Sequence, residues 1–263
     1  MTAVTFRFWL GTHETSWLER AAFPLFVSHR RLRLRRSLPR AAGPWALDSG
    51  GFTALSGDGQ WDMTPRQYVT AVERYAAEIG RLEWAAPMDW MCEPAVRGRT
   101  GKTVTEHQQL TVDNYLRLRD IAPQLPFVPV LQGWDLDDYL RCADLYAARG
   151  VDLSREPLTG IGSVCRRQAT AQIAGVVAGL ADAGIRLHGF GVKIRGLAVY
   201  GGDLASADSM AWSARGRRVP GCGRGRHKNE ANCFEFAAAW RRRLLAGTEW
   251  QQLSFGSILR EAS

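Results

Sequence analysis

The chain has 263 residues, of which 46% are hydrophobic and 23% are charged, and its formal net charge is +8. This composition is ordinary for one large globular domain or two small ones with a substantial core. No segment approaches the roughly 18 apolar residues of a membrane span, and the N-terminus lacks a signal-peptide pattern. Five cysteines, few and odd in number, argue against a secreted disulfide framework. We therefore expect a cytoplasmic, non-membrane protein with reduced thiols or one metal site.

The positive charge is concentrated in one segment, 30–40, which holds six arginines. A pI near 9.7 and such a run favour a polyanionic partner, with nucleic acid as the natural choice. A basic run of this kind is also compatible with a solvated surface. Charge alone leaves both interpretations open.

Eight short apolar runs recur along the chain with helical patterns between them. They are Phe6–Leu10, Pro24–Val27, Trp45–Leu47, Trp84–Pro87, Phe127–Leu131, Leu158–Val164, Leu187–Val192 and Ala207–Trp212. Most do not alternate apolar and polar residues, which is typical of parallel strands buried on both faces. The sequence thus predicts eight buried strands.

The segments between these runs carry helix signals. Thr64 and Gln67 form a capping-box pattern with Pro65 at the first helical position, and Thr105 with Gln108 repeats the pattern. Tyr68, Val72, Tyr75 and Ile79 share one face of the helix that begins at Thr64. Apolar spacing predicts further helices at Leu136, Leu140 and Ala143; Ile173, Val176, Val177 and Leu180; and Phe236, Trp240 and Leu244.

Strands and helices in this order predict an α/β fold, a (β/α)8 TIM-type barrel that forms a single domain over residues 1–263. A doubly wound open sheet is the alternative architecture. No linker, low-complexity tract or internal repeat divides the chain. In a barrel the catalytic groups lie at the C-terminal ends of the strands, so the residues that follow each apolar run are the candidates for function.

Polar residues follow these runs. Asp48 ends the third run and begins the motif Asp48-Ser49-Gly50-Gly51-Phe52, Asp89 and Gln132 follow the fourth and fifth, and Asp208 belongs to the eighth. A carboxylate can attack an anomeric carbon, and carboxylate and amide groups match the hydrogen-bonding edge of guanine. Each aspartate alone could be a helix cap or a turn residue. Together they predict a site that binds and cleaves a nucleoside.

Three tryptophans, Trp90, Trp134 and Trp212, lie just beyond strand ends. An indole there could stack on an extruded base, or it could pack in the core or at the rim of the barrel.

The motif 48–52, Asp89, Val130-Leu131-Gln132-Gly133, and Asp208 followed by Ser213-Ala214-Arg215 resemble, in order, the motifs of tRNA-guanine transglycosylases. The resemblance covers residues 45–215. Chain length and flanking segments resemble more closely the short relatives that insert 7-deazaguanines into DNA, the DpdA-like transglycosylases. The resemblance implies that Asp208 is the nucleophile, which forms a glycosyl ester at C1′, and that Asp48 is the acid/base group.

The same resemblance implies a set of substrate-binding residues: Ser49, Asp89, Gln132, Gly160, Gly162, His188 and Arg215. Asp89 and Gln132 would read the base edge, Gly160, Gly162 and His188 would line the pocket, and Arg215 would contact phosphate or ribose.

The chain departs from the tRNA enzymes where those enzymes have a zinc site of three cysteines and a histidine. The residues here are Cys222, His227 and Cys233, with Glu230 as a candidate fourth ligand, in a predicted loop and helix over 220–247. Either a structural Zn²⁺ site or a degenerate site fits this pattern, and the basic segment 221–228 could instead touch phosphate.

Taken together, the sequence predicts a transglycosylase that exchanges guanine in DNA for a 7-deazaguanine base of the preQ0 type through a covalent aspartyl intermediate. The alternatives are exchange in tRNA, a non-catalytic nucleic-acid-binding barrel, and a carbohydrate hydrolase. Exchange in DNA, exchange in tRNA and nucleic-acid binding all give the net positive charge a role, whereas the hydrolase does not.

Overall fold

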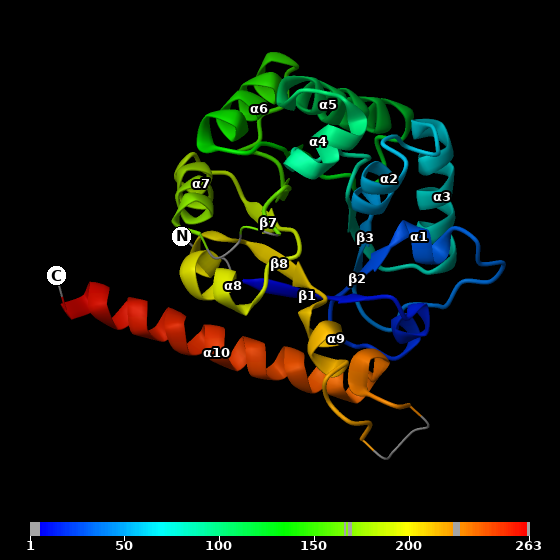
Figure 1. The fold of residues 1–263 in the computed structure, drawn as a ribbon, viewed down its shortest axis with the longest axis vertical. Helices are drawn as coiled ribbons and strands as arrows, with labels where there is room; N and C mark the ends of the chain where they lie inside the picture. Colours follow the sequence, from blue (N-terminus) through cyan, green and yellow to red (C-terminus); the bar gives the residue numbers. More distant parts are fainter. Residues whose placement is uncertain (1–5, 166, 168–169, 223–226, 262–263) are drawn as a thin grey trace.

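The computed structural model describes residues 6–165, 167, 170–222 and 227–261, with only the backbone from residue 248 onward. Figure 1 shows strands gathered at the centre and helices around them. The strands are β1 (Arg7–Thr12), β2 (Leu25–Ser28), β3 (Trp45–Asp48), β4 (Leu82–Ala85), β5 (Val130–Leu131), β6 (Thr159–Ile161), β7 (Leu187–Gly189) and β8 (Ser206–Ser209). Each lies within or beside one of the eight predicted runs.

All strand pairs are parallel, and the order in the sheet is β4-β3-β2-β1-β8-β7-β6-β5. The two ends of this order also meet, because Ala85 donates to the Pro126 carbonyl at 2.9 Å and accepts from Val128 N–H at 3.2 Å. The structure confirms an α/β fold on a curled eight-stranded parallel sheet, consistent with the predicted TIM-type barrel. A doubly wound sheet would require the strand order to reverse within the sheet, which it does not do.

The helices are α1 (His29–Leu32), α2 (Gly51–Gly57), α3 (Pro65–Glu78), α4 (Pro94–Thr100), α5 (Val104–Ile121), α6 (Leu136–Ala148), α7 (Ala171–Asp182), α8 (Ile194–Tyr200), α9 (Ala211–Gly216) and α10 (Phe234–Glu261). Short 3₁₀ turns occupy Thr15–Glu19, Gly201–Asp203 and Glu230–Asn232. None of the helices in the described part of the chain combines the length and apolar character needed to cross a bilayer.

The capping box of Thr64 and Gln67 at the start of α3 is confirmed. The one predicted at Thr105 and Gln108 is wrong, because α5 begins two residues earlier with Thr103 as its cap and Glu106 as the reciprocal partner. Glu106 is exposed and free to turn back to the Thr103 N–H, whereas the Gln108 side chain is buried and donates to the carbonyls of Gln132 and Asp138.

The predicted helix after Gly133 exists as α6, but its buried face differs from the prediction. Leu136 and Leu140 are exposed. The buried side chains are Asp138, Tyr139, Cys142 and Tyr146. Two of these are tyrosines whose hydroxyls reach strand backbone: Tyr139 donates to the Gly162 carbonyl, and Tyr146 bonds both backbone groups of Val130. Hydroxyl partners inside the barrel therefore decide which side of α6 faces inward.

Alternation along the strands separates two apolar layers. Phe8 and Leu10 of β1 pack outward against the helices, while Trp9 between them points into the barrel with Phe26 and Trp84. On β3, Trp45 and Leu47 pack outward and Ala46 inward, so Asp48 belongs to the inward set. On β8, Ala207 packs outward, so Asp208 belongs to the inward set as well. The alternation thus aims both aspartates at the barrel axis.

Candidate active site

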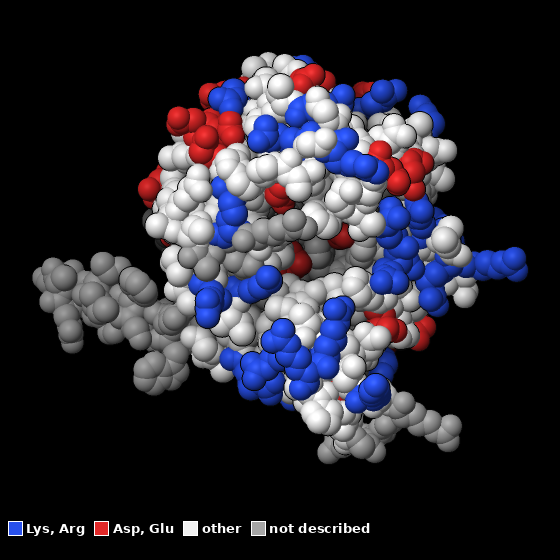
Figure 2. Space-filling model, in the orientation of Figure 1, with Lys and Arg blue, Asp and Glu red and all other residues white. Residues whose placement is uncertain are grey.

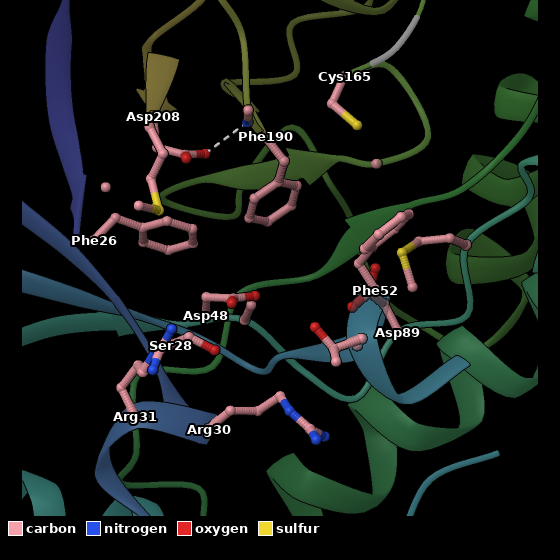
Figure 3. Close-up of a pocket in the computed structure, with 18 of the residues that line it drawn as sticks. Phe26, Ser28, Arg30, Arg31, Asp48, Phe52, Asp89, Cys165, Phe190 and Asp208 are labelled. Carbon is pink, nitrogen blue, oxygen red and sulfur yellow. Dashed lines mark hydrogen bonds between the residues drawn. The ribbon is translucent and has the colours of Figure 1, made fainter. Parts of the chain in front are cut away.

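A cavity of about 490 Å³ opens at the C-terminal ends of the strands. Figure 2 shows it as a central hollow with acidic side chains inside. Among its lining residues are Gly11, Thr12, His13, Phe26, Ser28, Arg30, Arg31, Asp48, Phe52, Asp89, Met91, Glu93, Gly162, Ser163, Cys165, Phe190, Gly191, Asp208 and Met210. The three aspartates predicted from the strand ends therefore share one cavity, as Figure 3 shows.

Asp208 lies on β8 and is almost fully buried, with 6% of its surface exposed. Its Oδ1 accepts a hydrogen bond from the Gly191 N–H at 2.8 Å, and His188 Nε2 lies 3.4 Å from the same oxygen. No hydrogen bond from another described residue reaches Oδ2. The carboxylate is held by one oxygen, while the other is left for a ligand in the cavity.

His188 itself does not line the cavity. It is fully buried behind Asp208, in edge contact with Trp84 and Phe190, and its Nδ1 bonds the Ser206 hydroxyl at 2.8 Å. Burial lowers its pKa below 6.5 and outweighs the neighbouring Asp208 carboxylate, which raises it. We therefore expect a neutral imidazole that positions Asp208 from behind.

Asp48 ends β3, where the chain turns sharply into α2. Gly50 has a φ of +81°, a conformation open to glycine, and this turn lets its N–H donate to Asp48 Oδ1 at 3.1 Å. Burial is the main cause that raises the pKa of Asp48, and the negative charge of Asp208 raises it further. Hydrogen bonds from Gly50 and Ser28 act in the opposite direction. Asp48 is thus the carboxyl suited to hold and release a proton.

Asp89 follows β4 and faces the same space. Burial, and secondly the charge of Asp48, raise its pKa to about 7, although a hydrogen bond from Gln132 opposes the shift. Gln132 Nε2 donates to Asp89 Oδ2 at 2.5 Å, and the Ser49 hydroxyl lies 3.5 Å from Oδ1. Asp89 is therefore a carboxylate aimed by its neighbours, and near neutral pH both of its protonation states are populated.

Gln132 is fully buried and lies behind the cavity wall. Its Oε1 accepts from the Ser163 hydroxyl at 2.7 Å, and that hydroxyl in turn accepts from the Cys92 N–H at 2.7 Å. Gly162 lies against it so closely that a Cβ there would come within 2.2 Å of Gln132 Nε2. The glycine thus makes room for the amide, and the serine fixes which way the amide points.

The aromatic residues of the cavity are Phe26, Phe52 and Phe190, and none of the three tryptophans considered above is among them. Trp212 is buried and donates to the Gly11 carbonyl, Trp90 packs on His107, and Trp134 lies 3.7 Å beneath the Arg167 guanidinium. The core and rim interpretation of these tryptophans is therefore correct, because each ring packs against protein groups outside the cavity lining.

Three other predicted site residues lie off the cavity surface. Gly160 packs under the Phe190 ring, where a Cβ would come within 2.4 Å of it. Ser49 is buried beneath Asp89, and Arg215 is exposed on α9 outside the cavity lining. Of the predicted binding residues that were not aspartates, only Gly162 lines the cavity directly.

The predicted metal ligands do come together. One ligand atom from each of Cys222, His227, Glu230 and Cys233 lies within 4.8 Å of the others. Glu230 is 2% exposed, and both of its carboxylate oxygens lack a hydrogen-bond donor in the described part of the chain. The Glu230 carboxylate is also 3.4 Å from His227 Nε2, so the thiols, imidazole and carboxylate face one another as the ligands of a cation would. This cluster could hold a metal ion.

Several lining residues were not predicted from the sequence: His13, Ser28, Arg30, Arg31 and Glu93. Ser28 could have been found, because it ends β2 and pairs in register with Asp48. His13 and Glu93 lie a few residues past the ends of the apolar runs, beyond the first polar positions that mark strand ends, and the two arginines were hidden within a longer basic run.

The chain was compared with known proteins. Comparison with curated proteins finds no match. Residues 4–259, nearly the whole chain, match the family model described as DpdA, DeoxyPurine in DNA protein A. With three aspartates gathered in one cavity at the mouth of a parallel barrel, this match identifies the chain as a member of the DpdA family.

Proposed function

We propose that this protein exchanges guanine in DNA for a 7-deazaguanine base of the preQ0 type. Membership of the DpdA family supports a role in 7-deazaguanine modification of DNA. The observation that carries the proposal is the meeting of Asp48, Asp89 and Asp208 in one cavity of about 490 Å³, a size that fits a base and its sugar.

In the first half of the proposed reaction, an Asp208 oxygen attacks C1′ of the deoxyribose. A C1′–O bond forms and the C1′–N9 bond breaks, so guanine leaves with the bonding electron pair. Asp48, whose pKa is raised by burial, donates the proton that neutralises the departing base. The product of this half is a glycosyl ester on Asp208.

In the second half, the 7-deazaguanine enters the cavity and Asp48, now ionised, removes its N9 proton. N9 attacks C1′, and Asp208 leaves as a free carboxylate. Asp48 ends with the proton with which it began, so the exchange is balanced without an outside acid, base or energy source. Two carboxyls with different environments suit this division of roles.

Asp89 would recognise either base. In its ionised form it accepts hydrogen bonds from the N1–H and exocyclic amine that guanine and 7-deazaguanine share. Phe26, Phe52 and Phe190 supply apolar ring faces for the base. Gln132 would act through Asp89, because the glutamine amide holds this carboxylate at 2.5 Å.

A covalent-adduct experiment tests the proposal. The protein is incubated with labelled duplex DNA, single-stranded DNA or tRNA and then denatured, and adducts are counted on a gel. We expect an adduct with DNA that is lost in Asp208→Asn and discharged by adding preQ0. If tRNA formed more adduct than DNA, tRNA would be the substrate. If Asp208→Asn formed as much adduct as the wild type, Asp208 would not be the nucleophile. DNA binding without any adduct would favour the non-catalytic barrel.

We also propose that Cys222, His227, Glu230 and Cys233 hold a structural Zn²⁺. A bound zinc would neutralise the thiolates and the buried Glu230 and tie the turn Glu230–Asn232 to the preceding loop. Native mass spectrometry should find one zinc per chain, and Cys233→Ser should lose the metal and lower the melting temperature. A metal-free wild-type protein of unchanged stability after treatment with a chelator would contradict this assignment.

A further inference from the structure

Cationic and hydrogen-bond-donating side chains lie along one side of the cavity mouth, between α1 and α9. Arg30 and Arg31 of α1 and His13, just beyond β1, line the cavity itself. Three exposed arginines lie on α9 or directly after it: Arg215, Arg217 and Arg218. Figure 2 shows Lys and Arg side chains gathered over α1 and below the hollow near α9.

His13 contacts one of these arginines directly. Arg31 Nε donates to His13 Nδ1 at 3.3 Å. Partial burial lowers the pKa of His13 and the charge of Arg31 lowers it further, whereas the charge of Glu14 raises it. Arg217 directly follows α9, and α9 begins straight after Met210, which also lines the cavity. The cavity mouth is therefore bordered by the residue after β1, by α1 and by α9.

The contact with Arg31 also fixes the hydrogen-bonding state of His13. A guanidinium can only donate, so Nδ1 must be the acceptor and the ring proton of the neutral imidazole must be on Nε2. The lowered pKa keeps the ring neutral at pH 7. His13 thus presents an Nε2–H donor beside the Arg31 guanidinium.

Some arginines of the described chain have a carboxylate partner and others do not. Arg7, Arg33 and Arg149 each form an ion pair with a carboxylate. Arg31 and Arg217 form none among the residues that the structure describes. Two uncompensated guanidinium groups and a neutral N–H donor match the geometry and charge of a phosphodiester.

We propose that Arg31, His13 and Arg217 form a phosphate clamp that grips the DNA backbone beside the target nucleotide while its base enters the cavity. The clamp rests on the proposed function only in taking DNA as the partner. Because His13 and Arg31 line the same cavity as Asp208, a phosphate held there keeps the adjoining sugar at the mouth. A base must leave the duplex stack to reach buried carboxylates, and a fixed backbone would hold the nucleotide in that extruded position.

Salt-dependent binding tests the clamp. The affinity for a fluorescein-labelled duplex is measured by anisotropy across a NaCl series for the wild type, Arg31→Ala, Arg217→Ala and His13→Ala. Each arginine variant should reduce the slope of log K against log [NaCl] by about 0.9, the value for one phosphate contact. His13→Ala should weaken binding with the slope unchanged, because the ring carries no charge. The losses should be equal on duplexes of unrelated sequence.

Arg186→Ala is the matched control, since Arg186 is exposed directly before β7, at the opposite end of the barrel. Its slope should equal that of the wild type, and thermal unfolding confirms that every variant is folded. Wild-type slopes in both Arg31→Ala and Arg217→Ala would overturn the clamp. Asp208→Asn separates the two proposals: it should lose the covalent adduct and keep the full slope. Slope losses without a wild-type adduct would defeat the proposed reaction and leave the clamp standing.

Discussion

The two ends of the barrel each carry a hollow, and they differ in how charge is arranged. The hollow at the N-terminal ends of the strands, about 630 Å³, is larger than the cavity at the C-terminal ends, about 490 Å³. At the larger one, Arg7 pairs with Glu83 at 2.5 Å and Arg119 with Glu156 at 3.7 Å. At the smaller one, Asp48, Asp89 and Asp208 face one cavity and form no ion pair with Arg or Lys within the described residues.

This difference in charge pairing distinguishes a candidate active site from an ordinary surface hollow. Ion pairs on a solvated surface contribute little to the free energy of folding, and their charges are already balanced, so they offer a ligand no unpaired charge. Carboxylates gathered in a buried space raise one another's pKa, so the folded chain keeps them there at a cost in stability. Volume alone would have selected the wrong end of the barrel.

The largest effect should come from the proton-handling carboxyl. Asp48→Asn keeps the size of the side chain and removes the ability to exchange a proton. General acid–base catalysis contributes about 10²- to 10⁴-fold, so we expect a loss of that order in the exchange of labelled guanine into DNA. Glu83→Gln, the same type of change at the opposite end, should leave exchange unaltered. If Asp48→Asn and Glu83→Gln reduced the exchange rate equally, the cavity at the C-terminal ends of the strands would not be the active site.

Asp89 allows a test through pH. Its pKa of about 7 in the folded protein lies above the usual value of 3.8, so the folded state binds more protons than the unfolded state between these values. Stability contributed by the protonated form is therefore lost as pH rises through 7. Asp89→Asn should be more stable than the wild type at pH 8, by an amount that shrinks as the pH falls toward 4. Denaturant unfolding at both pH values measures this difference.

The same titration should appear in ligand binding. Only ionised Asp89 accepts from the N1–H and amine of guanine, so the affinity of the wild type for guanine should fall as pH drops below about 7. Affinity that stays constant between pH 8 and pH 5.5 would contradict the role of Asp89 as the reader of the base edge.

A smaller effect is expected at Ser163, a cavity-lining residue whose hydroxyl orients the Gln132 amide. Its φ of +58° is unfavourable for a residue with a Cβ, and its hydroxyl satisfies the buried Cys92 N–H. Ser163→Ala should lower the free energy of unfolding by about 1–3 kcal/mol, the cost of an unsatisfied buried donor. Ser163→Gly loses the same hydroxyl but relieves the backbone, so it should be about 1 kcal/mol more stable than Ser163→Ala. Thermal and urea unfolding of Ser163→Ala and Ser163→Gly measure this difference. Equal stabilities of the two variants would show that the positive φ at this position costs no stability.

The sequence predicted the strands and the three aspartates because both depend on local order: an apolar run, then a polar residue at its end. Alternation within β3 and β8 then aims Asp48 and Asp208 inward, as a barrel requires. The sequence did not reveal that His13, Arg31 and Glu93 line the cavity. His13 and Glu93 follow strand ends and Arg31 lies on the short helix α1, and only contacts between distant segments bring the three together. The buried face of α6 was mispredicted for a related reason, because tyrosine hydroxyls find backbone partners that no helical spacing encodes.

The smallest effect is expected at the far end of the barrel. Arg7 and Glu83 are 40% and 37% exposed, so solvent screens their pairing and Glu83→Gln should change the free energy of unfolding by less than about 1 kcal/mol. The difference from the wild type should shrink further in 1 M NaCl, where screening acts within about 3 Å. Urea unfolding at low and high salt measures it. A large loss of unfolding free energy that does not depend on salt would mean that the Arg7–Glu83 pair stabilises the barrel. The two ends would then not differ in the way that their charges suggest.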